Sequence, residues 1–164
     1  MYSRTLFVVA VALLGGLTSC DDDSSNPILP TIVTARELVI DKTWKVTATT
    51  EKKGDQPAEN LYLDVPSCFQ DNLYTFQASG AFVLDEGPTR CDQQDPQTRT
   101  GTWALSNSGT TLRGTITLAT QPGNDASLEL GGVIESLTAT RLMLVERDTT
   151  GGVTTVTRTT LMAQ

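Results

Sequence analysis

The hairpin pattern between Asp71 and Glu86 constrains the fold of this chain more than any other segment. Large apolar residues alternate with smaller or polar ones on both sides of Gly80. A two-residue turn at Ser79-Gly80 and a three-residue turn over residues 78–80, with Gly80 in the left-handed conformation, are both plausible. We predict the three-residue turn, because only that register places four large apolar side chains on one face. It pairs Phe76 with Phe82 and Tyr74 with Leu84.

Similar short segments, rich in threonine and branched apolar residues and bounded by turn residues, fill the rest of the chain. The cleanest alternation places Leu112, Ile116 and Leu118 on one face of a strand. A bulge or sharp bend is expected at Gly131-Gly132. Besides the two hairpin arms, we expect strands over residues 44–51, 99–106, 110–119, 128–137, 141–146 and 153–161. About eight antiparallel strands with up-and-down connections either close into a barrel or fold into a sandwich.

One short helix is predicted before the first strand, over residues 35–41. Thr34 can cap it, and Glu37 follows three residues later at the spacing of a capping box. The β-branched residues Thr43 and Val46 then favour an extended strand, so the helix ends early.

The first nineteen residues are typical of an export signal. Arg4 precedes an apolar run from Leu6 to Leu14, which is too short to span a bilayer. Leu17-Thr18-Ser19-Cys20 resembles the lipobox of bacterial lipoproteins. That resemblance implies cleavage before Cys20 and attachment of acyl chains such as palmitate to it. The alternative is an ordinary signal peptide with a chance cysteine at its end.

An acidic and proline-containing segment follows Cys20 and is expected to be a flexible tether over residues 20–33. The folded domain is then expected over residues 34–164. Asp21-Asp22-Asp23 resembles the surface-export signal of some outer-membrane lipoproteins. We therefore expect a lipid-anchored protein of the outer membrane displayed on the cell surface, with a periplasm-facing position as the alternative.

Charge and residue content exclude several function classes. The chain carries a formal net charge of −7, which argues against binding to nucleic acid. It contains no histidine, which removes the commonest general base and most zinc-site geometries. Asp85 and Glu86 are adjacent and point to opposite faces of a strand, so they make a poor acid–base pair. We expect no catalytic residues, no cofactor and no metal site.

Cys68 and Cys91 remain as an even pair once Cys20 is taken by the lipid. They lie at similar distances from the hairpin turn, on opposite arms. Extending the strand pairing would bring their backbones close enough for a disulfide. The alternative is two free thiols.

Four short motifs resemble the bacterial lipocalin-like domain of small membrane-anchored lipoproteins. They are Lys42-Thr43-Trp44-Lys45-Val46, Asp71-Asn72-Leu73-Tyr74-Thr75-Phe76 with Gly80 and Phe82, Gly101-Thr102-Trp103-Ala104-Leu105, and Ile134-Glu135-Ser136-Leu137-Thr138. With the short helix before the first motif and the leucine-rich strand after the last, the resemblance spans residues 34 to 161. Lipocalins carry Gly-x-Trp at the first strand, and Lys42 stands in the glycine position here. The resemblance implies an eight-stranded barrel.

A barrel of this size holds either a packed interior or one small ligand. We expect it to bind a small apolar ligand, and the candidate cavity residues are the aromatic ones. The alternative for each of them is a place in the packed core, and their small number argues against a large cavity. They are Trp44, Tyr74, Phe76, Phe82 and Trp103.

The alternative function is a protein- or glycan-binding module of the adhesin or inhibitor type. It would act through loops 52–60, 87–98 and 120–126. Loop 87–98 carries Arg90, Asp92, Asp95 and Arg99, and a disulfide at Cys91 would hold it on the rigid sheet.

Overall fold

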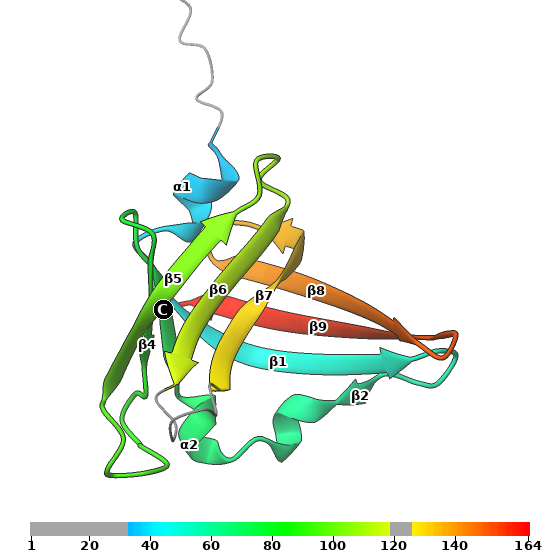
Figure 1. The fold of residues 1–164 in the computed structure, drawn as a ribbon, viewed down its shortest axis with the longest axis horizontal. Helices are drawn as coiled ribbons and strands as arrows, with labels where there is room; N and C mark the ends of the chain where they lie inside the picture. The colour runs from blue at the N-terminus through cyan, green and yellow to red at the C-terminus, as the bar shows by residue number, and fades with distance from the viewer. Residues whose placement is uncertain (1–32, 119–125) are drawn as a thin grey trace, which may run out of the picture. The chain divides into compact units, whose positions relative to one another are not determined.

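The domain is a closed antiparallel barrel preceded by a short helix (Figure 1). The computed structural model describes residues 33–118 and 126–164, so the expected signal, Cys20 and nearly all of the tether lie outside the described residues. Strands follow one another around the sheet in chain order, and the last strand returns to the first. This closure confirms the all-β up-and-down barrel and decides against a sandwich.

The longest strands are β1, β7, β8 and β9, while the helices and the strands β2 to β4 are short. Their bounds are α1 Ala35–Val39, β1 Thr43–Lys53, β2 Glu59–Asn60, η1 (a 3₁₀ helix) Leu61–Asp64, α2 Ser67–Gln70, β3 Leu73–Phe76, β4 Ala81–Asp85, β5 Thr98–Leu105, β6 Thr111–Leu118, β7 Ala126–Leu137, β8 Arg141–Thr150 and β9 Val153–Ala163.

Strand β1 closes the barrel because it pairs with two strands that are distant in the sequence. Trp44 lies opposite Tyr74 of β3 and opposite Ala163 of β9. The β1–β9 ladder continues to Lys53, with one register shift between Val46 and Ala48. Eight strands therefore form the barrel, as expected, while the two-residue β2 is an addition at the edge of β1.

The β3–β4 hairpin has the predicted register. Phe76 pairs with Phe82 and Tyr74 pairs with Leu84, around a turn in which Gly80 has a φ of 92°. The aromatic rings of the hairpin stack inside the barrel: Phe82 lies 5.0 Å from Phe76 and 6.0 Å from Tyr74, measured between ring centroids. The one-sided apolar pattern thus decided the register.

Helix α1 begins as predicted and ends two residues early. Thr34 and Glu37 form the full capping box, and the hydrogen bonds from Thr34 lower the pKa of the Glu37 carboxyl. The helix ends because Asp41 adopts a φ of 54°, and its backbone N–H donates to the carbonyl oxygen of Phe76 at 3.0 Å. This bond ties the end of α1 to the β3–β4 hairpin.

Of the bulge or sharp bend expected at the two glycines of β7, the bulge is absent. The ladder with β6 runs through Gly131 and Gly132 without a shift, and the register shift with β8 lies further on, between Ile134 and Ser136. Gly132 has a φ of 137°, and a Cβ there would lie 2.8 Å from the carbonyl oxygen of Val145. The residue is therefore glycine because β7 bends here and passes close to β8.

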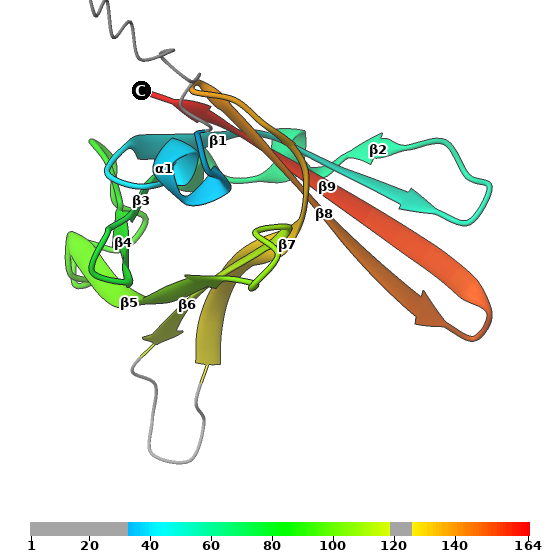
Figure 2. The same cartoon turned by 90° about the horizontal axis from the view of Figure 1, so that it is seen from above.

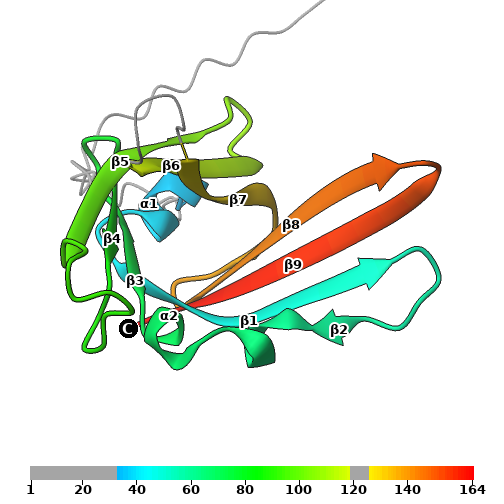
Figure 3. The same cartoon turned by 60° about the horizontal axis from the view of Figure 1, so that its bottom comes forward.

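Strand β8 extends beyond its predicted end, and with β1 and β9 it reaches out past the barrel (Figures 2 and 3). Strand β8 continues from Glu146 to Thr150, where it pairs with Val153 across the turn at Gly151-Gly152. Residues 52–60, expected to be a loop, contain the end of β1 and all of β2. Both errors have one cause: these strand ends are polar on both faces, so no alternation marks them.

Candidate functional site

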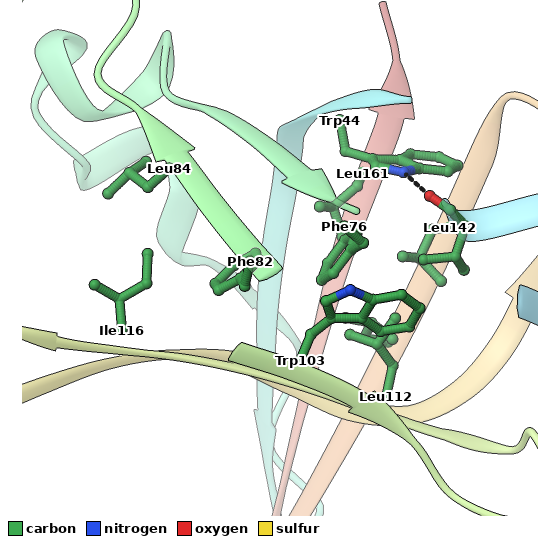
Figure 4. Close-up of a cluster of buried hydrophobic side chains, with 11 residues drawn as sticks. Trp44, Phe76, Phe82, Leu84, Trp103, Leu112, Ile116, Leu142 and Leu161 are labelled. Carbon is green, nitrogen blue, oxygen red and sulfur yellow. Dashed lines mark hydrogen bonds between the residues drawn. The ribbon is translucent and has the colours of Figure 1, made fainter. Parts of the chain in front are cut away.

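The packed core includes the end of the barrel that α1 covers and continues along the sheet to Leu84 and Ile116 (Figure 4). The Trp44 indole N–H donates to the carbonyl oxygen of Val39 at 2.9 Å, and Val39 is itself fully buried. The Trp103 indole N–H donates to the carbonyl oxygen of Gln77 at 2.8 Å, and the Arg36 guanidinium lies 4.9 Å from the centre of its ring. Helix α1 and its contacts therefore close this end.

Four of the five aromatic residues predicted for the cavity or the core lie in this packed end. Trp44, Phe76 and Phe82 are fully buried, and Trp103 is nearly so. Apolar side chains from β6, β8 and β9 fill the space between them, among them Leu112, Leu142 and Leu161 (Figure 4). Only Tyr74, which is half-buried, faces a cavity.

A cavity of about 410 Å³ lies at the other end of the barrel. Its walls come from the inner faces of β1, β3, β7 and β9 and from the segment that contains η1 and α2. The lining residues are Val46, Thr49, Tyr62, Val65, Phe69, Asn72, Tyr74, Leu128, Leu130 and Thr159. Its volume falls within the range of small-molecule binding sites, and its walls are mostly apolar.

Strand alternation explains the apolar wall that β7 provides. Leu128 and Leu130 face inward and are half-buried, while Ser127 and Glu129 between them are exposed. Glu129 pairs with Arg113 of β6 on the outer surface at 2.6 Å. The inward leucines complete the cavity wall across from Val46 of β1, so the pleat of the sheet itself positions them.

Segment 61–72, which carries η1 and α2, forms the remaining wall and is held by hydrogen bonds. The Tyr62 hydroxyl can donate to the carbonyl oxygen of Val46 at 2.7 Å or of Gln70 at 3.0 Å. The Gln70 side-chain amide donates to the carbonyl oxygen of Val65 at 2.6 Å. Phe69, which lines the cavity, is 50% exposed. This wall is thus attached to β1 and reaches solvent at the same time.

The Cys68–Cys91 disulfide fixes the same segment to the loop between β4 and β5, with Cα atoms 5.2 Å apart. The predicted bridge is present, but the expected extension of the strand pairing is not. The β3–β4 ladder stops at Leu73 and Asp85, and Cys68 lies in helix α2. The disulfide therefore replaces the ladder as the link that holds α2 at the barrel end.

Two residues with polar groups, Asn72 just before β3 and Tyr74 within it, interrupt the apolar lining of the cavity. Asn72 is only 5% exposed, and its side-chain oxygen has no hydrogen-bond partner among the described residues. Burial raises the pKa of the Tyr74 phenol above its ordinary value of 10.0; hydrogen bonding by Asn72 opposes this and the nearby Tyr62 adds to it. Burial, assisted by the charge of Asp71, also raises the pKa of Tyr62. Both phenols are therefore neutral donors at physiological pH.

The cavity residues other than Tyr74 were missed from the sequence. Leu128 and Leu130 stand in an expected strand, but that strand had no assigned faces. Asn72 stands two residues before Tyr74 in the expected hairpin, so strand alternation places it on the same face, but nothing in the sequence marked this polar residue as part of a cavity wall. This alternation and that of Leu128-Glu129-Leu130 were the usable signals.

Loop 87–98, the main feature of the alternative interaction module, uses its charges internally. Arg99 lies 2.6 Å from the carboxylate of Asp95 and 3.9 Å from that of the buried Glu86. Arg90 donates to the carbonyl oxygen of Asp95 at 2.7 Å and to the Gln93 side chain at 2.9 Å. These groups hold the loop together instead of presenting free charge. Nearly all of the third expected loop, 120–126, lies outside the described residues.

A larger surface hollow of about 750 Å³ lies between the tips of the β1–β2 and β8–β9 hairpins. Lysines 52 and 53 and backbone around Gly54 and Gly152 line it. Val153 and Val156 also line it, but charged residues, among them Asp55, make up much of the rest, whereas the barrel cavity has no charged lining residue. Over residues 33–118 and 126–164 there is no cluster of three or more residues able to hold a metal ion. Within the same residues, no helix is long and apolar enough to cross a bilayer.

Comparison with known families agrees with the barrel geometry. The sequence profile of the lipocalin-like domain matches residues 40–144, which is more than half of the chain. No curated protein matches the sequence significantly. The matched region begins just before β1 and ends within β8, so it includes Val46, Asn72, Tyr74, Leu128 and Leu130 of the cavity. The chain belongs to the lipocalin-like domain family.

Proposed function

We propose that the domain binds one small apolar ligand in the cavity of about 410 Å³ at the end of the barrel opposite α1. Lipocalin-like barrels generally bind small hydrophobic molecules, and an eight-stranded barrel leaves room for one of them. The observation that carries the proposal is the unequal filling of this barrel. Aromatic and leucine side chains pack the α1 end, whereas Val46, Leu128 and Leu130 pack against this core on one side and line the cavity on the other.

The half-buried apolar walls supply the binding free energy. Each square ångström of apolar surface removed from water contributes roughly 25 cal/mol, before the entropy lost on binding is subtracted. Segment 61–72 carries two exposed apolar side chains: Phe69, which lines the cavity, and Leu63, which is 75% exposed. This arrangement gives an apolar molecule a route from the surface to the interior along α2.

Titration with a neutral fluorescent probe, N-phenylnaphthylamine, tests the proposal. The protein is the chain from residue 20 onward with Cys20→Ser, so that no lipid is attached. We expect saturable binding in the parent and a loss of at least tenfold in Leu128→Trp, whose indole fills the cavity. Ser127→Trp is the matched control, because its side chain is exposed on the outer face of the same strand.

A parent protein that binds no probe would refute the proposal. Equal binding by Leu128→Trp would also refute it, because the probe would then sit elsewhere. Either outcome favours the protein- or glycan-binding module as the function, acting through the loops of the barrel.

The proposal includes attachment to a membrane through lipid on Cys20, after removal of residues 1–19. It rests on the sequence alone: the apolar run from Leu6 to Leu14 and the lipobox-like residues up to Cys20. Two or three acyl chains anchor a protein stably, whereas one gives marginal binding. The acidic residues after Cys20 support display on the outer membrane surface.

Metabolic labelling with an alkyne analogue of palmitate tests the anchor. We expect label in the parent and none in Cys20→Ala, with Cys68→Ala as the control that retains it. Protease digestion of intact cells then separates the cell surface from the periplasm. Protection of the chain in intact cells, with digestion after lysis, would place it on the periplasmic side.

A further inference from the structure

Strand β7 leaves part of one edge unpaired beside the cavity. Its ladder with β6 covers residues 126–133, but its ladder with β8 covers only residues 133–137. Strand β8 goes on with β9 alone. Strands β7 and β8 therefore separate beyond the pair Val133–Val145 (Figures 2 and 3). Within the described part of the chain, residues 126–132 have no neighbouring strand on that side.

The hydrogen bonds to β6 show which backbone groups of this edge are free. Ile134 donates its N–H to the carbonyl oxygen of Thr110 at 2.8 Å, in line with the β6–β7 ladder. In an antiparallel ladder, every second residue directs both backbone groups to the same neighbour, and the residues between them direct theirs to the opposite side. Because the ladder runs without a shift, the N–H and C=O groups of Ser127, Glu129 and Gly131 point away from β6, toward the open side.

The same stretch of β7 carries the apolar wall of the cavity. Leu128 and Leu130 face inward between the three edge residues and line the cavity of about 410 Å³. On the outer surface, Glu129 is already paired with Arg113 at 2.6 Å. A further strand along this edge would therefore place every second side chain next to the two leucines, at the cavity, and the side chains between them on the outer surface.

The unpaired edge of β8 and the chain's own tether are less suitable for such pairing. Glu146, Arg147 and Asp148 follow one another along β8, and charged residues on an edge oppose the addition of a strand. None of the described residues that line the cavity belongs to β8. In the tether, Pro27 and Pro30 lack the N–H that a ladder needs. The edge of β7 therefore suits a strand from another molecule.

We propose that β7 binds an extended segment of a partner protein as an added antiparallel strand along residues 127–131. The segment exchanges backbone hydrogen bonds with the free groups of this edge, and apolar side chains at every second position enter the cavity against Leu128 and Leu130. The backbone bonds supply affinity, and the cavity selects the side chains. This inference goes beyond the proposed function: it uses the same cavity but a macromolecular partner, which competes with a small ligand.

Fluorescence anisotropy of a labelled heptapeptide tests the inference on the chain from residue 20 onward with Cys20→Ser. The peptide has leucine at its third and fifth positions, threonine at the second, fourth and sixth, and lysine at both ends. We expect saturable binding that displaces N-phenylnaphthylamine. N-methylation of the three threonines blocks the amides that face β7, so binding is expected to weaken about tenfold or more. N-methylation of the two leucines, whose amides face away, is the matched control and is expected to leave binding within about twofold.

The variant Glu129→Pro removes one donor from the protein side of the contact. The Glu129 N–H faces the open side, so the β6–β7 ladder keeps its hydrogen bonds, and proline is accepted at such positions of an edge strand. We expect the variant to bind the peptide about tenfold more weakly and to keep its affinity for N-phenylnaphthylamine, which shows that the barrel is folded. Glu129→Ala, which keeps the N–H, is the control and is expected to bind the peptide like the parent.

Amide hydrogen exchange, followed by nuclear magnetic resonance, reports on the edge without any substitution in the barrel. In the free protein, the amides of Ser127, Glu129 and Gly131 are expected to exchange faster than those of Leu128 and Leu130, which bond to β6. Saturating peptide is expected to slow the three edge amides about tenfold. Slow exchange of these amides in the free protein would overturn the inference, because the edge would then already be paired.

The outcomes separate this inference from the proposed function. Equal binding by the two methylated peptides, or a reversed preference between them, would overturn the antiparallel docking. Uptake of N-phenylnaphthylamine without binding of the peptide would overturn the inference and leave the proposed function standing. Binding of the peptide without uptake of the probe would support the inference and refute the proposed function.

Discussion

Replacing Gly114 of β6 by alanine tests how tightly the aromatic core is packed. Gly114 is buried, and a Cβ at this position would lie 2.9 Å from two ring carbons of Phe82 and 3.0 Å from a third. Carbon atoms pack best at separations of about 3.5–4.0 Å, so the added methyl group overlaps the ring. Phe82 is fully buried and stacks with Phe76 and Tyr74, which restricts its ability to move away.

Two opposing contributions determine how much Gly114→Ala changes the free energy of unfolding. Inserting one methyl group into a well-packed core costs about 1–3 kcal/mol. Removing a glycine from a strand returns roughly 0.5–1 kcal/mol through the smaller entropy of the unfolded chain. We therefore expect Gly114→Ala to lower the free energy of unfolding by about 1–2 kcal/mol and Tm by about 4–8 °C.

A double-mutant cycle with Phe82→Leu assigns the effect to this contact. Urea denaturation followed by tryptophan fluorescence gives the free energy of unfolding of the parent, both single variants and the double variant. With the ring removed, the added methyl group of Gly114→Ala has room, so its cost is expected to fall by about 1 kcal/mol or more. A neutral Gly114→Ala variant, or strict additivity in the cycle, would refute the packing described for this end of the barrel.

Three further predictions test the disulfide, a close backbone approach and the buried phenol. Replacing Cys68 and Cys91 together by serine is expected to lower the free energy of unfolding by about 3.5 kcal/mol, measured by urea denaturation; an unchanged midpoint would contradict it. Gly101→Ala is expected to prevent folding, seen as loss of the near-ultraviolet circular dichroism signal, because a Cβ would overlap the carbonyl oxygen of Thr115. The raised pKa of Tyr74 leaves stability intact below about pH 10 and reduces it above that value, where the phenol of the unfolded chain ionises first. Tyr74→Phe should flatten this alkaline decline in denaturation experiments, and an identical slope in both proteins would exclude Tyr74 as its source.

The fold could be predicted from the sequence where one face of a strand is buried. The register of the β3–β4 hairpin followed from Tyr74, Phe76, Phe82 and Leu84, because only one pairing puts them on the same side. The end of β8 could not be predicted, because residues such as Thr149 are exposed and pair with β9 through the backbone and their hydroxyls. Strand pairing without burial leaves no periodic signal.

The cavity could not be predicted, because it depends on how far other elements fill the barrel. An inward aromatic residue near the N-terminal end of β1, such as Trp44, meets α1 and becomes core. An inward Tyr74, close to it in the sheet, meets segment 61–72, which leaves space. Two inward aromatic residues thus have different roles. The difference depends on where α1 and α2 pack, and these helices are not the strands that carry the two residues.

The place of Asn72 in the cavity wall was equally difficult to predict from the sequence. In the sequence it is one of several asparagines next to a turn, where such residues usually bond to their own backbone. Its distinction comes only from burial against the cavity and from the unpaired side-chain oxygen. Neither property is local, so no motif search would separate Asn72 from the exposed Asn107.

Native mass spectrometry of the protein, expressed and exported in its own host as the chain from residue 20 onward with Cys20→Ser, tests the existence of a bound ligand most directly. We predict a retained small-molecule mass that is lost on denaturation, is absent from Leu128→Trp and is present in Ser127→Trp. A bare polypeptide mass in the parent, together with no uptake of N-phenylnaphthylamine, would contradict the ligand-binding barrel.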